Sequence, residues 1–348
     1  MLALFFVLYL SSSYQSSPSC DPEDIFWGKH SGHLIFKGKV SEEGDSEDME
    51  PEASFQRYFY KNNSLLAKVF RKQKTKYMIF PFNEAATIEK FHHNPYVVKM
   101  KFCFYTEDSV TIFVEELGGD LSHKKKYFFE QPLKRQFDQL IRLSNTFNEM
   151  HRRGYIHGDI KPRNLVFSRN RRTIKIIDFG FSVMVGDKTM GHTDFYSAPE
   201  LLNDKTEEID AETSQDSWSW VLTIIYLLVP STYRKMRYVF RNQDACLYTI
   251  RSIDIIIQEL ERYSIEWNLP LTKRLGPLLQ LKPDKRPSMK AIGKSLKRLL
   301  NEYRKELHKT GRVSTSSSSR CSSSDNDSIL ATPNVSELPT PQPQPDFD

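Results

Sequence analysis

One stretch of the sequence restricts the fold and the chemistry of this chain more than any other. It reads Tyr155-Ile-His-Gly-Asp-Ile-Lys-Pro-Arg-Asn164 and is followed by Ile176-Ile-Asp-Phe-Gly180. Two acids, Asp159 and Asp178, lie 19 positions apart, with Lys161 and Asn164 between them. Such a set suits phosphoryl transfer, in which one carboxylate orients the attacking hydroxyl while the other carboxylate and the amide hold magnesium. Positioning dominates this reaction, so we expect Asp159 to be the base and Asn164 and Asp178 to be the magnesium ligands.

The order of the expected elements favours an α+β fold with two lobes, because a strand-rich front half precedes a helix-rich back half. Runs rich in β-branched and aromatic residues predict strands at Leu34–Val40, Ser54–Tyr60, Ser64–Phe70, Tyr96–Tyr105, Ser109–Glu115, Asn164–Phe167 and Thr173–Ile177. Apolar residues at helical spacing predict helices at Asn83–Phe91, Leu133–Arg153, Ser217–Leu228, Tyr248–Arg262, Leu271–Leu279 and Met289–Leu307. Gly154 is the expected cap of the helix that precedes it. The hinge between the lobes is expected near Glu116–Asp120.

Composition agrees with a globular chain that buries its own core. Hydrophobic residues make up 39% and charged residues 27% of the 348 residues, which excludes wholesale disorder, a collagen-like chain and a protein with many membrane spans. Cys20, Cys103, Cys246 and Cys321 lie far apart, so neither a disulfide framework nor a zinc site is expected. The net charge of +5 is uneven, because Ser41–Glu52 holds seven acids and no base. Outside this run and the C-terminal tail the chain carries about +15, which favours anionic partners or reflects a solvated, lysine-rich surface.

Both ends of the chain differ in composition from the part between them. Met1–Leu10 is apolar and a serine-rich run follows it, as in a signal peptide, but the segment lacks the positively charged start. About ten residues are too few to span a bilayer, so a secretory leader and an apolar arm both stay open. From Thr310 the chain is rich in Ser and then in Pro, which predicts a disordered tail. The chain is therefore divided into an apolar segment at 1–20, a strand-rich lobe at 21–115 with an acidic insertion at 41–52, a helical lobe at 116–309 and a tail at 310–348.

The stretch from Tyr155 to Gly180 resembles the catalytic loop and the Asp-Phe-Gly motif of eukaryotic-type protein kinases, and the resemblance extends over residues 30–305. Further motifs match in order: Gly191-His-Thr-Asp-Phe-Tyr196, Ala198-Pro-Glu200, Asp216-Ser-Trp-Ser219 and Lys282-Pro-Asp-Lys-Arg-Pro287. The resemblance implies a two-lobed kinase fold, in which a small β-rich lobe and a larger helical lobe hold ATP and magnesium between them. It also implies that Arg286 pairs with Glu200, and that Asp216 holds the backbone of the catalytic loop.

The resemblance also assigns residues to the nucleotide. Lys68 corresponds to the lysine that grips the α- and β-phosphates of ATP, and Glu84 corresponds to the helix glutamate that holds this lysine. The run from Glu115 to Asp120 resembles the hinge. The resemblance implies that the backbone at Glu115 and Leu117 bonds the adenine and that Asp120 reaches the ribose.

Two further residues bear on the substrate. Lys161, two positions after Asp159, takes the form found in Ser/Thr kinases and would neutralise the γ-phosphate. Thr193 would bond both Asp159 and Lys161. The other expected site residues belong to the activation segment and its supports: Phe179, Gly180, Glu200, Asp216 and Arg286. The resemblance therefore implies an ATP-dependent kinase that phosphorylates Ser or Thr of proteins.

Three positions depart from the family pattern. The Gly-x-Gly-x-x-Gly-x-Val phosphate cradle is missing, and the acidic insertion 41–52 stands at that turn, where seven acids would repel ATP unless they loop away from it. Gly158 stands where most relatives have Arg, so the charge that would pair with a phosphate on the activation segment is missing. We therefore predict activity without phosphorylation of that segment. Val221 stands where the family's buried helix has Gly, as a packing variation.

Two other functions stay open from the sequence. The acidic insertion motivates a pseudokinase that binds partners without turnover. His157-Gly-Asp159 also resembles small-molecule kinases of the aminoglycoside and choline type, although these lack the Ala-Pro-Glu segment and the late Arg-Pro motif. We expect protein substrates that bear Ser or Thr, no nucleic-acid partner, and a monomer. A cytoplasmic location is expected, with the secretory pathway as the alternative and membrane contact only through residues 1–20.

Overall fold

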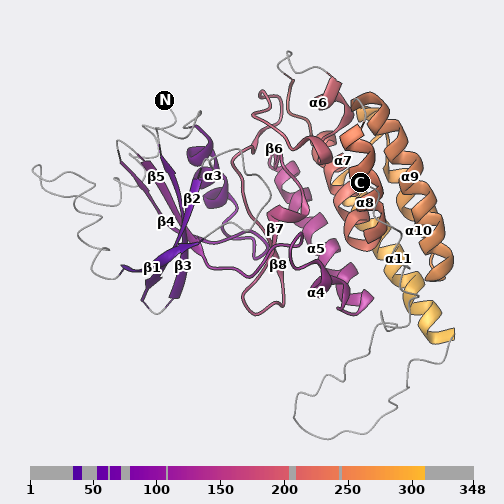
Figure 1. The fold of residues 1–348 in the computed structure, drawn as a ribbon, viewed down its shortest axis with the longest axis horizontal. Helices are drawn as coiled ribbons and strands as arrows, with labels where there is room; N and C mark the ends of the chain where they lie inside the picture. Colours follow the sequence, from indigo (N-terminus) through magenta and orange to yellow (C-terminus); the bar gives the residue numbers. More distant parts are fainter. Residues whose placement is uncertain are drawn as a thin grey trace, which may run out of the picture.

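The computed structural model describes residues 34–40, 53–61, 63–71, 79–106, 109–203, 209–242 and 245–309. These residues form two lobes, one a sheet with a single helix and the other mainly helical (Figure 1), which confirms the predicted α+β class. The predictions for the apolar segment 1–20, the acidic insertion 41–52 and the tail 310–348 lie outside the described residues. The lobe limits at 21–115 and 116–309 stay a prediction. Within the described ranges, every helix is too short or too polar to cross a membrane.

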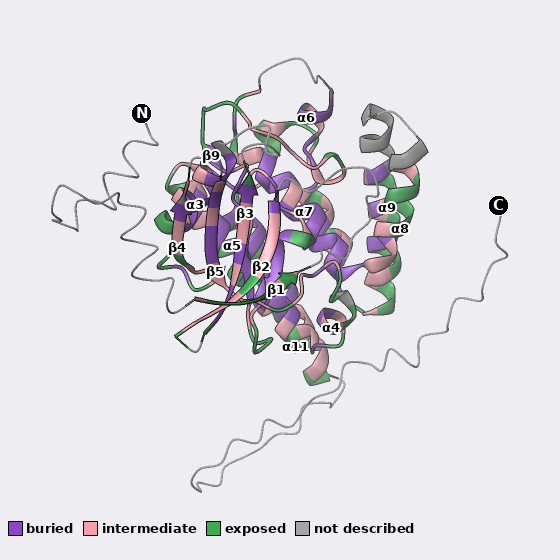
Figure 2. Ribbon diagram, turned by 60° about the vertical axis from the view of Figure 1, so that its left-hand side comes forward, coloured by how far each residue is buried: buried purple, intermediate pink, exposed green. Residues whose placement is uncertain are grey.

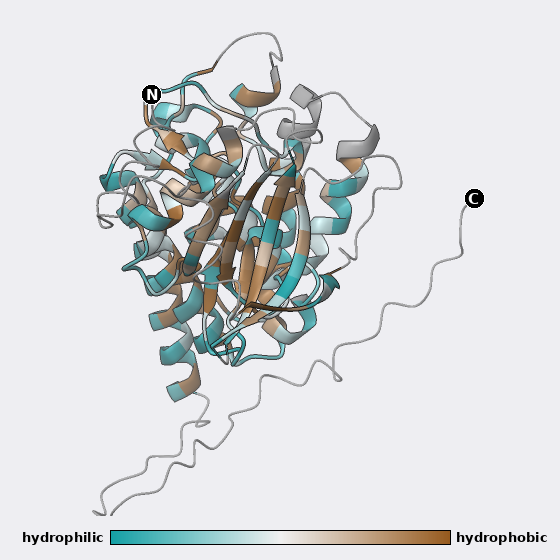
Figure 3. Ribbon diagram, turned by 90° about the vertical axis from the view of Figure 1, so that its left-hand side faces the viewer, coloured by the Kyte–Doolittle hydropathy of each residue, from teal (hydrophilic) through white to brown (hydrophobic). Residues whose placement is uncertain are grey.

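The small lobe is an antiparallel sheet of five strands in the order β1-β2-β3-β5-β4. Its strands are β1 (Leu34–Val40), β2 (Ala53–Tyr60), β3 (Asn63–Arg71), β4 (Met100–Tyr105) and β5 (Ser109–Glu115). The sides of β3 differ because successive side chains of a strand point to opposite faces of the sheet. Leu65 and Ala67 belong to one apolar cluster with Phe113, and Figure 3 shows apolar residues through the middle of the sheet. Leu66 and Lys68 line a cavity on the other side.

Helix α3 (Ile79–Lys90) packs against β4 and β5. It begins four residues before the predicted start at Asn83, because Pro81 lies in the first turn, where a helix has no use for the missing N–H. The earlier start matters for the site. Phe80 contacts Phe181 and Asn83 bonds the Ser182 carbonyl, so the first turns of α3 touch the activation segment.

The larger lobe surrounds one almost wholly buried helix, α7 (Figure 2). Its helices are α4 (Lys125–Phe129), α5 (Leu133–Arg152), α6 (Pro199–Asn203), α7 (Thr213–Leu228), α8 (Pro230–Asn242), α9 (Ala245–Glu266), α10 (Leu271–Leu275) and α11 (Met289–Lys309). Trp220 of α7 has no exposed surface, and its indole N–H donates to Ser144 Oγ of α5 at 2.9 Å. Helix α11, the last helix of the described residues, also packs on α5. These contacts give the catalytic loop, which follows α5, a rigid base.

Two short strand pairs flank the loops that contain Asp159, Asn164 and Asp178. They are β6 (Tyr155–Ile156) with β9 (Val183–Met184), and β7 (Leu165–Phe167) with β8 (Ile174–Ile176). The register of β7 and β8 pairs Leu165 with Ile176, and the Ile177 N–H donates to the Asn164 carbonyl at 3.0 Å. Asn164 and Asp178, which are 14 positions apart in the chain, are therefore neighbours across this pair.

Several predicted boundaries were wrong, each for a local reason. The strand predicted at Tyr96–Tyr105 begins only at Met100, because Tyr96 and Val98 bond Ile176 of the large lobe instead of the sheet. Helix α7 begins at Thr213 and not at Ser217, since Glu212 and Gln215 form a capping box. The helix predicted at Leu271–Leu279 ends at Leu275, where Gly276 and Pro277 turn into a 3-10 helix.

The prediction also missed helices α4, α6 and α8 and strands β6 and β9. A signal for α8 exists in the sequence, because Pro230 takes the first position of the helix. Thr232 and Met236 are also one turn apart and buried, and the residues between them include the exposed Arg234 and Lys235. The other missed elements have only two to five residues, which is too short for a period to be recognised.

Candidate active site

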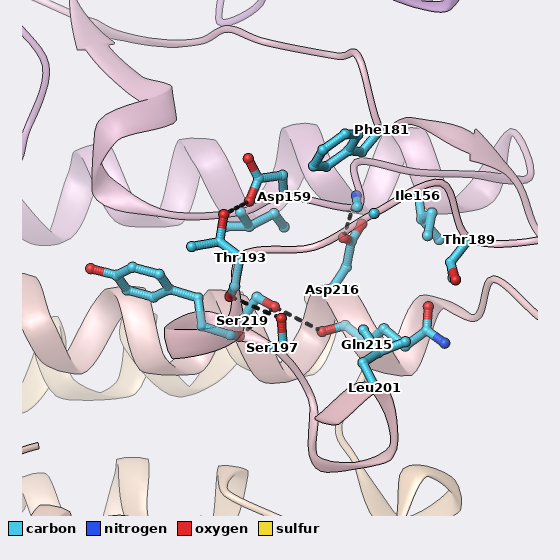
Figure 4. A pocket seen from close by; sticks show the side chains of 14 residues that line it. Ile156, Asp159, Phe181, Thr189, Thr193, Ser197, Leu201, Gln215, Asp216 and Ser219 are labelled. Carbon is cyan, nitrogen blue, oxygen red and sulfur yellow. Dashed lines mark hydrogen bonds between the residues drawn. The ribbon is translucent and has the colours of Figure 1, made fainter. Parts of the chain in front are cut away.

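A cavity of about 640 Å³ lies between the lobes, within the size range of small-molecule sites. Apolar side chains from both lobes form its walls: Leu66, Ile112 and Val114 from the sheet, and Val166 and Ile177 from the large lobe. Many of the predicted site residues line it: Lys68, Glu84, Glu115, Leu117, Asp120, Lys161, Asn164 and Asp178. Asp159 borders a second cavity of only about 10 Å³ beside the activation segment (Figure 4).

Lys68 joins the two lobes across the larger cavity. Its Nζ lies 2.8 Å from Glu84 Oε2 of α3 and 2.8 Å from Asp178 Oδ1. Asp178 has a φ of +62°, a left-handed conformation that costs a non-glycine residue of order 1–3 kcal/mol and is common at functional sites. The three residues come from β3, α3 and the loop after β8, so the lysine holds all three elements in one arrangement.

The charges in this group stabilise one another. Burial alone would lower the pKa of Lys68, but Asp178 and Glu84 outweigh burial and raise it. Burial alone would raise the pKa of Asp178, but Lys68 holds it below the ordinary value. Burial raises the pKa of Glu84, and Lys68 offsets only part of that increase. The lysine therefore stays cationic and Asp178 stays ionised, as binding of phosphates and a metal ion requires.

Three side chains hold the carboxylate of Asp159. Asn164 Nδ2 donates to the Asp159 carbonyl at 2.8 Å and to its Oδ2 at 3.0 Å. Lys161 Nζ lies 2.7 Å from the same Oδ2. The Thr193 hydroxyl donates to Oδ1 at 2.6 Å (Figure 4). The same hydroxyl accepts from Lys161 at 2.8 Å. The catalytic loop and the activation segment thus fix the orientation of this carboxylate together.

Asp216, at the start of buried α7, supports the catalytic loop from below. It accepts hydrogen bonds from the backbone N–H groups of His157 at 2.8 Å and Gly158 at 3.0 Å. His151 Nε2 also lies 2.8 Å from Asp216 Oδ2, a contact that the sequence did not predict. Burial alone would raise the pKa of Asp216, but His151 and the loop lower it. A histidine in the last turn of α5 carried no signal that distinguished it from an exposed residue.

The end of the activation segment is tied to the base of the large lobe. Arg286 makes a bidentate pair with Glu200, with Nη1 and Nη2 each 2.6 Å from a carboxylate oxygen. The Arg286 side chain is 1% exposed, and its guanidinium lies 5.3 Å from the Trp218 ring centroid. Buried bidentate pairs are rigid, so Glu200 gives the segment a fixed end.

Glu115 and Glu116, in the expected hinge, line the cavity, and their carboxylates bond residues of both lobes. Glu115 Oε1 accepts from the Lys99 N–H at 2.7 Å and contacts Lys175, which the sequence analysis did not single out. Glu116 bonds Arg57 and Ser64 of the sheet. These two acidic side chains therefore tie the expected hinge segment to both lobes.

Asp120 lines the cavity, yet its carboxylate already has partners. Oδ1 accepts from the N–H groups of Ser122 at 2.7 Å and His123 at 3.1 Å, and Oδ2 lies 2.8 Å from His123 Nδ1. Burial alone would raise the pKa of Asp120, but hydrogen bonds from the Ser122 hydroxyl, the His123 side chain and the two backbone N–H groups lower it. A ribose contact of Asp120 stays a prediction, and it would have to be shared with His123.

Asn164 and Asp178 offer donors that suit magnesium. The Asn164 amide nitrogen donates to Asp159, so its oxygen is left for other partners. Lys68 bonds only Oδ1 of Asp178, and both residues line the larger cavity. No group of three or more His, Cys, Asp or Glu side chains in the described residues could hold a metal ion. One amide and one carboxylate oxygen fit Mg²⁺, which keeps waters and phosphate oxygens as its other ligands.

The structure gives physical reasons for two departures from the family pattern. Gly158 has a φ of +82°, and a Cβ added there would lie 2.5 Å from the Phe181 carbonyl oxygen. A side chain at this position would therefore be strained and would clash with backbone. Val221 is 1% exposed in the middle of α7, where its larger side chain adds to the core.

Comparisons with known proteins agree with this geometry. A family model described as the protein kinase domain matches residues 60–296. Human serine/threonine-protein kinase D3 is 32% identical over 162 residues, which cover 43% of this chain and 17% of that protein. Serine/threonine-protein kinase cds1 of Schizosaccharomyces pombe is 29% identical over 219 residues, which cover 60% of this chain and 45% of that protein.

A solved structure shares the fold. The Cydia pomonella granulovirus kinase PK-1 superposes with a TM-score of 0.56 at 14% identity, covering 77% of this chain and 95% of that one. The matched stretches span less than half of the length of the two cellular kinases. Because the family model covers well over half of the sequence, the chain belongs to the protein kinase family.

Proposed function

We propose that this protein transfers the γ-phosphoryl group of ATP to Ser or Thr hydroxyls of protein substrates. The observation that carries the proposal is the mutual contact of Asp159, Lys161 and Thr193, at distances of 2.6 to 2.8 Å. This arrangement joins the residue that would orient a hydroxyl to a cation that would meet the γ-phosphate.

Each residue has a defined part in the proposed reaction. Asp159 orients the substrate hydroxyl and accepts its proton as the oxygen forms a bond to the γ-phosphorus. Lys161 compensates negative charge on the transferred group, and the oxygen between the β- and γ-phosphorus leaves with ADP. Lys68, held by Glu84, grips the α- and β-phosphates. Magnesium, bound by Asn164 and Asp178, would neutralise charge on the phosphates.

Specificity for Ser and Thr is supported by Lys161. Its ammonium bonds both Asp159 Oδ2 and the Thr193 hydroxyl, so it lies within reach of a short hydroxyl side chain presented to Asp159. The resemblance to Ser/Thr kinases at this lysine, and the names of the cellular relatives, point the same way. A cytoplasmic location, a monomer and the absence of a nucleic-acid partner stay predictions.

The decisive experiment is a transfer assay with purified full-length protein, labelled ATP and magnesium. A panel of basic and acidic protein substrates, choline and an aminoglycoside serve as acceptors, and phosphoamino-acid analysis identifies the product. We expect phosphoserine or phosphothreonine, and none with Asp159→Asn. Labelled choline or aminoglycoside would favour a small-molecule kinase. Nucleotide binding by thermal shift without transfer to any acceptor would favour a pseudokinase.

A further inference from the structure

Asn83 makes contacts that the kinase resemblance does not assign. It precedes Glu84 on α3, and its Nδ2 donates to the Ser182 carbonyl at 2.7 Å. The same nitrogen lies 3.1 Å from Met190 Sδ. Ser182 follows Asp178 by four positions, whereas Met190 precedes Thr193 by three. One amide therefore touches two parts of the activation segment that lie eight positions apart.

Phe181 fills the space between the same elements. Its ring meets Phe80 of α3 edge to face, with centroids 5.4 Å apart. A Cβ added at Gly191 would lie 2.8 Å from Phe181 Cζ, and one added at Gly158 would lie 2.5 Å from the Phe181 carbonyl oxygen. Figure 4 shows the ring above the small cavity, next to the loop that carries Asp159. Glycine at 191 therefore leaves room for the Phe181 ring, and glycine at 158 leaves room for the Phe181 backbone carbonyl.

These contacts are neutral, and the basic residues Lys188 and His192 of the segment have acidic partners. Lys188 pairs with Asp210 at 2.7 Å, and His192 Nε2 lies 3.1 Å from Asp194. Ser182 is 1% exposed, and its hydroxyl donates to the His157 carbonyl at 3.0 Å. Packing and amide hydrogen bonds therefore order the segment where a phosphate and its basic pocket would otherwise be needed.

We propose that Asn83 and Phe181 are positioning residues, which hold the activation segment against α3 without phosphorylation and so couple Glu84 and Lys68 to Thr193 and Asp159. The proposal rests on the proposed function for its kinetic part. Its structural part, that Asn83 and Phe181 order the segment, holds whatever the acceptor is.

Asn83→Asp tests the hydrogen bond with a change of almost no volume. The carboxylate cannot donate and would face the Ser182 carbonyl, so the segment should loosen. We expect kcat to fall at least tenfold, with a smaller change in the KM for the peptide. Lowering the pH should recover part of the activity, because a protonated carboxyl can donate again. Asn145→Asp, an exposed site on α5, is the matched control and should behave as wild type at every pH.

Hydrogen exchange supplies a readout that does not depend on catalysis. Amides at 183–190 should exchange at least tenfold faster in Asn83→Asp than in wild type or Asn145→Asp. All three proteins are first treated with phosphatase and checked by intact mass. Unchanged exchange and unchanged kcat in Asn83→Asp would overturn the proposal. If the wild type transfers no phosphate, but exchange at 183–190 is still faster in Asn83→Asp than in the wild type, the proposed function is overturned and this inference stands.

A double-mutant cycle tests Phe181. Gly191→Ala should lower kcat and speed exchange at 183–190, because the new methyl group meets the Phe181 ring. Phe181→Leu in the same chain should restore at least half of the loss by making room. If Gly191→Ala is silent, or if the double variant is worse than Gly191→Ala alone, Phe181 does not have this role.

Discussion

The hydroxyl of Thr193 donates to Oδ1 of Asp159 at 2.6 Å, across 34 positions of sequence. Lys161 bonds the same hydroxyl at 2.8 Å. The end of the activation segment is thus part of the hydrogen-bond shell of the proposed base. Displacing the segment would leave Asp159 with fewer restraints, so segment order and base orientation are coupled in this protein.

Thr193→Ala should lower kcat at least tenfold, about 1.4 kcal/mol in the barrier, because it removes one restraint on Asp159. The KM for ATP should change little, since Thr193 does not line the larger cavity. Thr193→Ser keeps the hydroxyl and should retain most of the activity. Steady-state kinetics of the three proteins check this, and an alanine variant with the wild-type kcat would contradict it.

Asp159→Asn and Asp178→Asn should separate chemistry from binding. The first removes the proposed proton acceptor, so turnover should vanish while ATP affinity stays within about threefold, under roughly 0.7 kcal/mol. The second weakens a magnesium ligand and the bond to Lys68, so magnesium-dependent ATP binding should fall as well. Calorimetric titration with and without magnesium measures both. Wild-type turnover in Asp159→Asn would mean that this residue is not the base.

Gly158→Ala should destabilise the protein more than Gly186→Ala. Both positions have positive φ, +82° and +90°, so the backbone strain of about 1 kcal/mol or more is shared. Only at Gly158 does a Cβ meet backbone, the Phe181 carbonyl at 2.5 Å, whereas nothing lies within 4 Å at Gly186. The two melting temperatures give the cost of that contact. Gly158→Arg, the family's usual residue, should be worse still, and equal melting temperatures would refute the argument.

Activity should not depend on phosphorylation of the activation segment. Thr189→Ala should change kcat by less than about threefold, under roughly 0.7 kcal/mol. The backbone N–H of Thr189 donates to the Ile209 carbonyl at 2.9 Å, and an alanine at this position can make the same bond. Phosphatase treatment followed by a turnover assay is the direct check. A hundredfold loss that rephosphorylation restores would show that Gly158 does not free the enzyme from this control.

Arg286→Ala should lower the free energy of unfolding by about 2 kcal/mol, because Glu200, whose side chain is 26% exposed, loses a bidentate partner. Lys285→Ala, at the residue immediately before Arg286, is the control. Lys285 and its partner Asp284 are each 66% exposed, so its loss should cost less than about 1 kcal/mol. Urea denaturation of the two variants measures the difference, and equal losses would deny the Arg286 pair a stabilising role.

Short spacings between residues were enough to predict part of the site. Asp159, Lys161 and Asn164 lie within six residues, so one turn of chain brings them together whatever the rest of the fold does. The strands β1 and β5 likewise matched their predicted limits, because β-branched and aromatic residues favour the extended backbone of a strand. The kinase fold followed from motifs of this local kind.

The contacts between distant segments depend on how the folded chain packs. Tyr96 and Val98 leave the sheet for β8, His151 reaches Asp216, and Asn83 reaches Ser182, although none of these residues carries a periodic or compositional signal. Which distant groups meet depends on how two lobes pack and on space left by single glycines such as Gly158. Packing complementarity of this kind is a property of the whole arrangement of side chains, and a local pattern of residue types does not encode it.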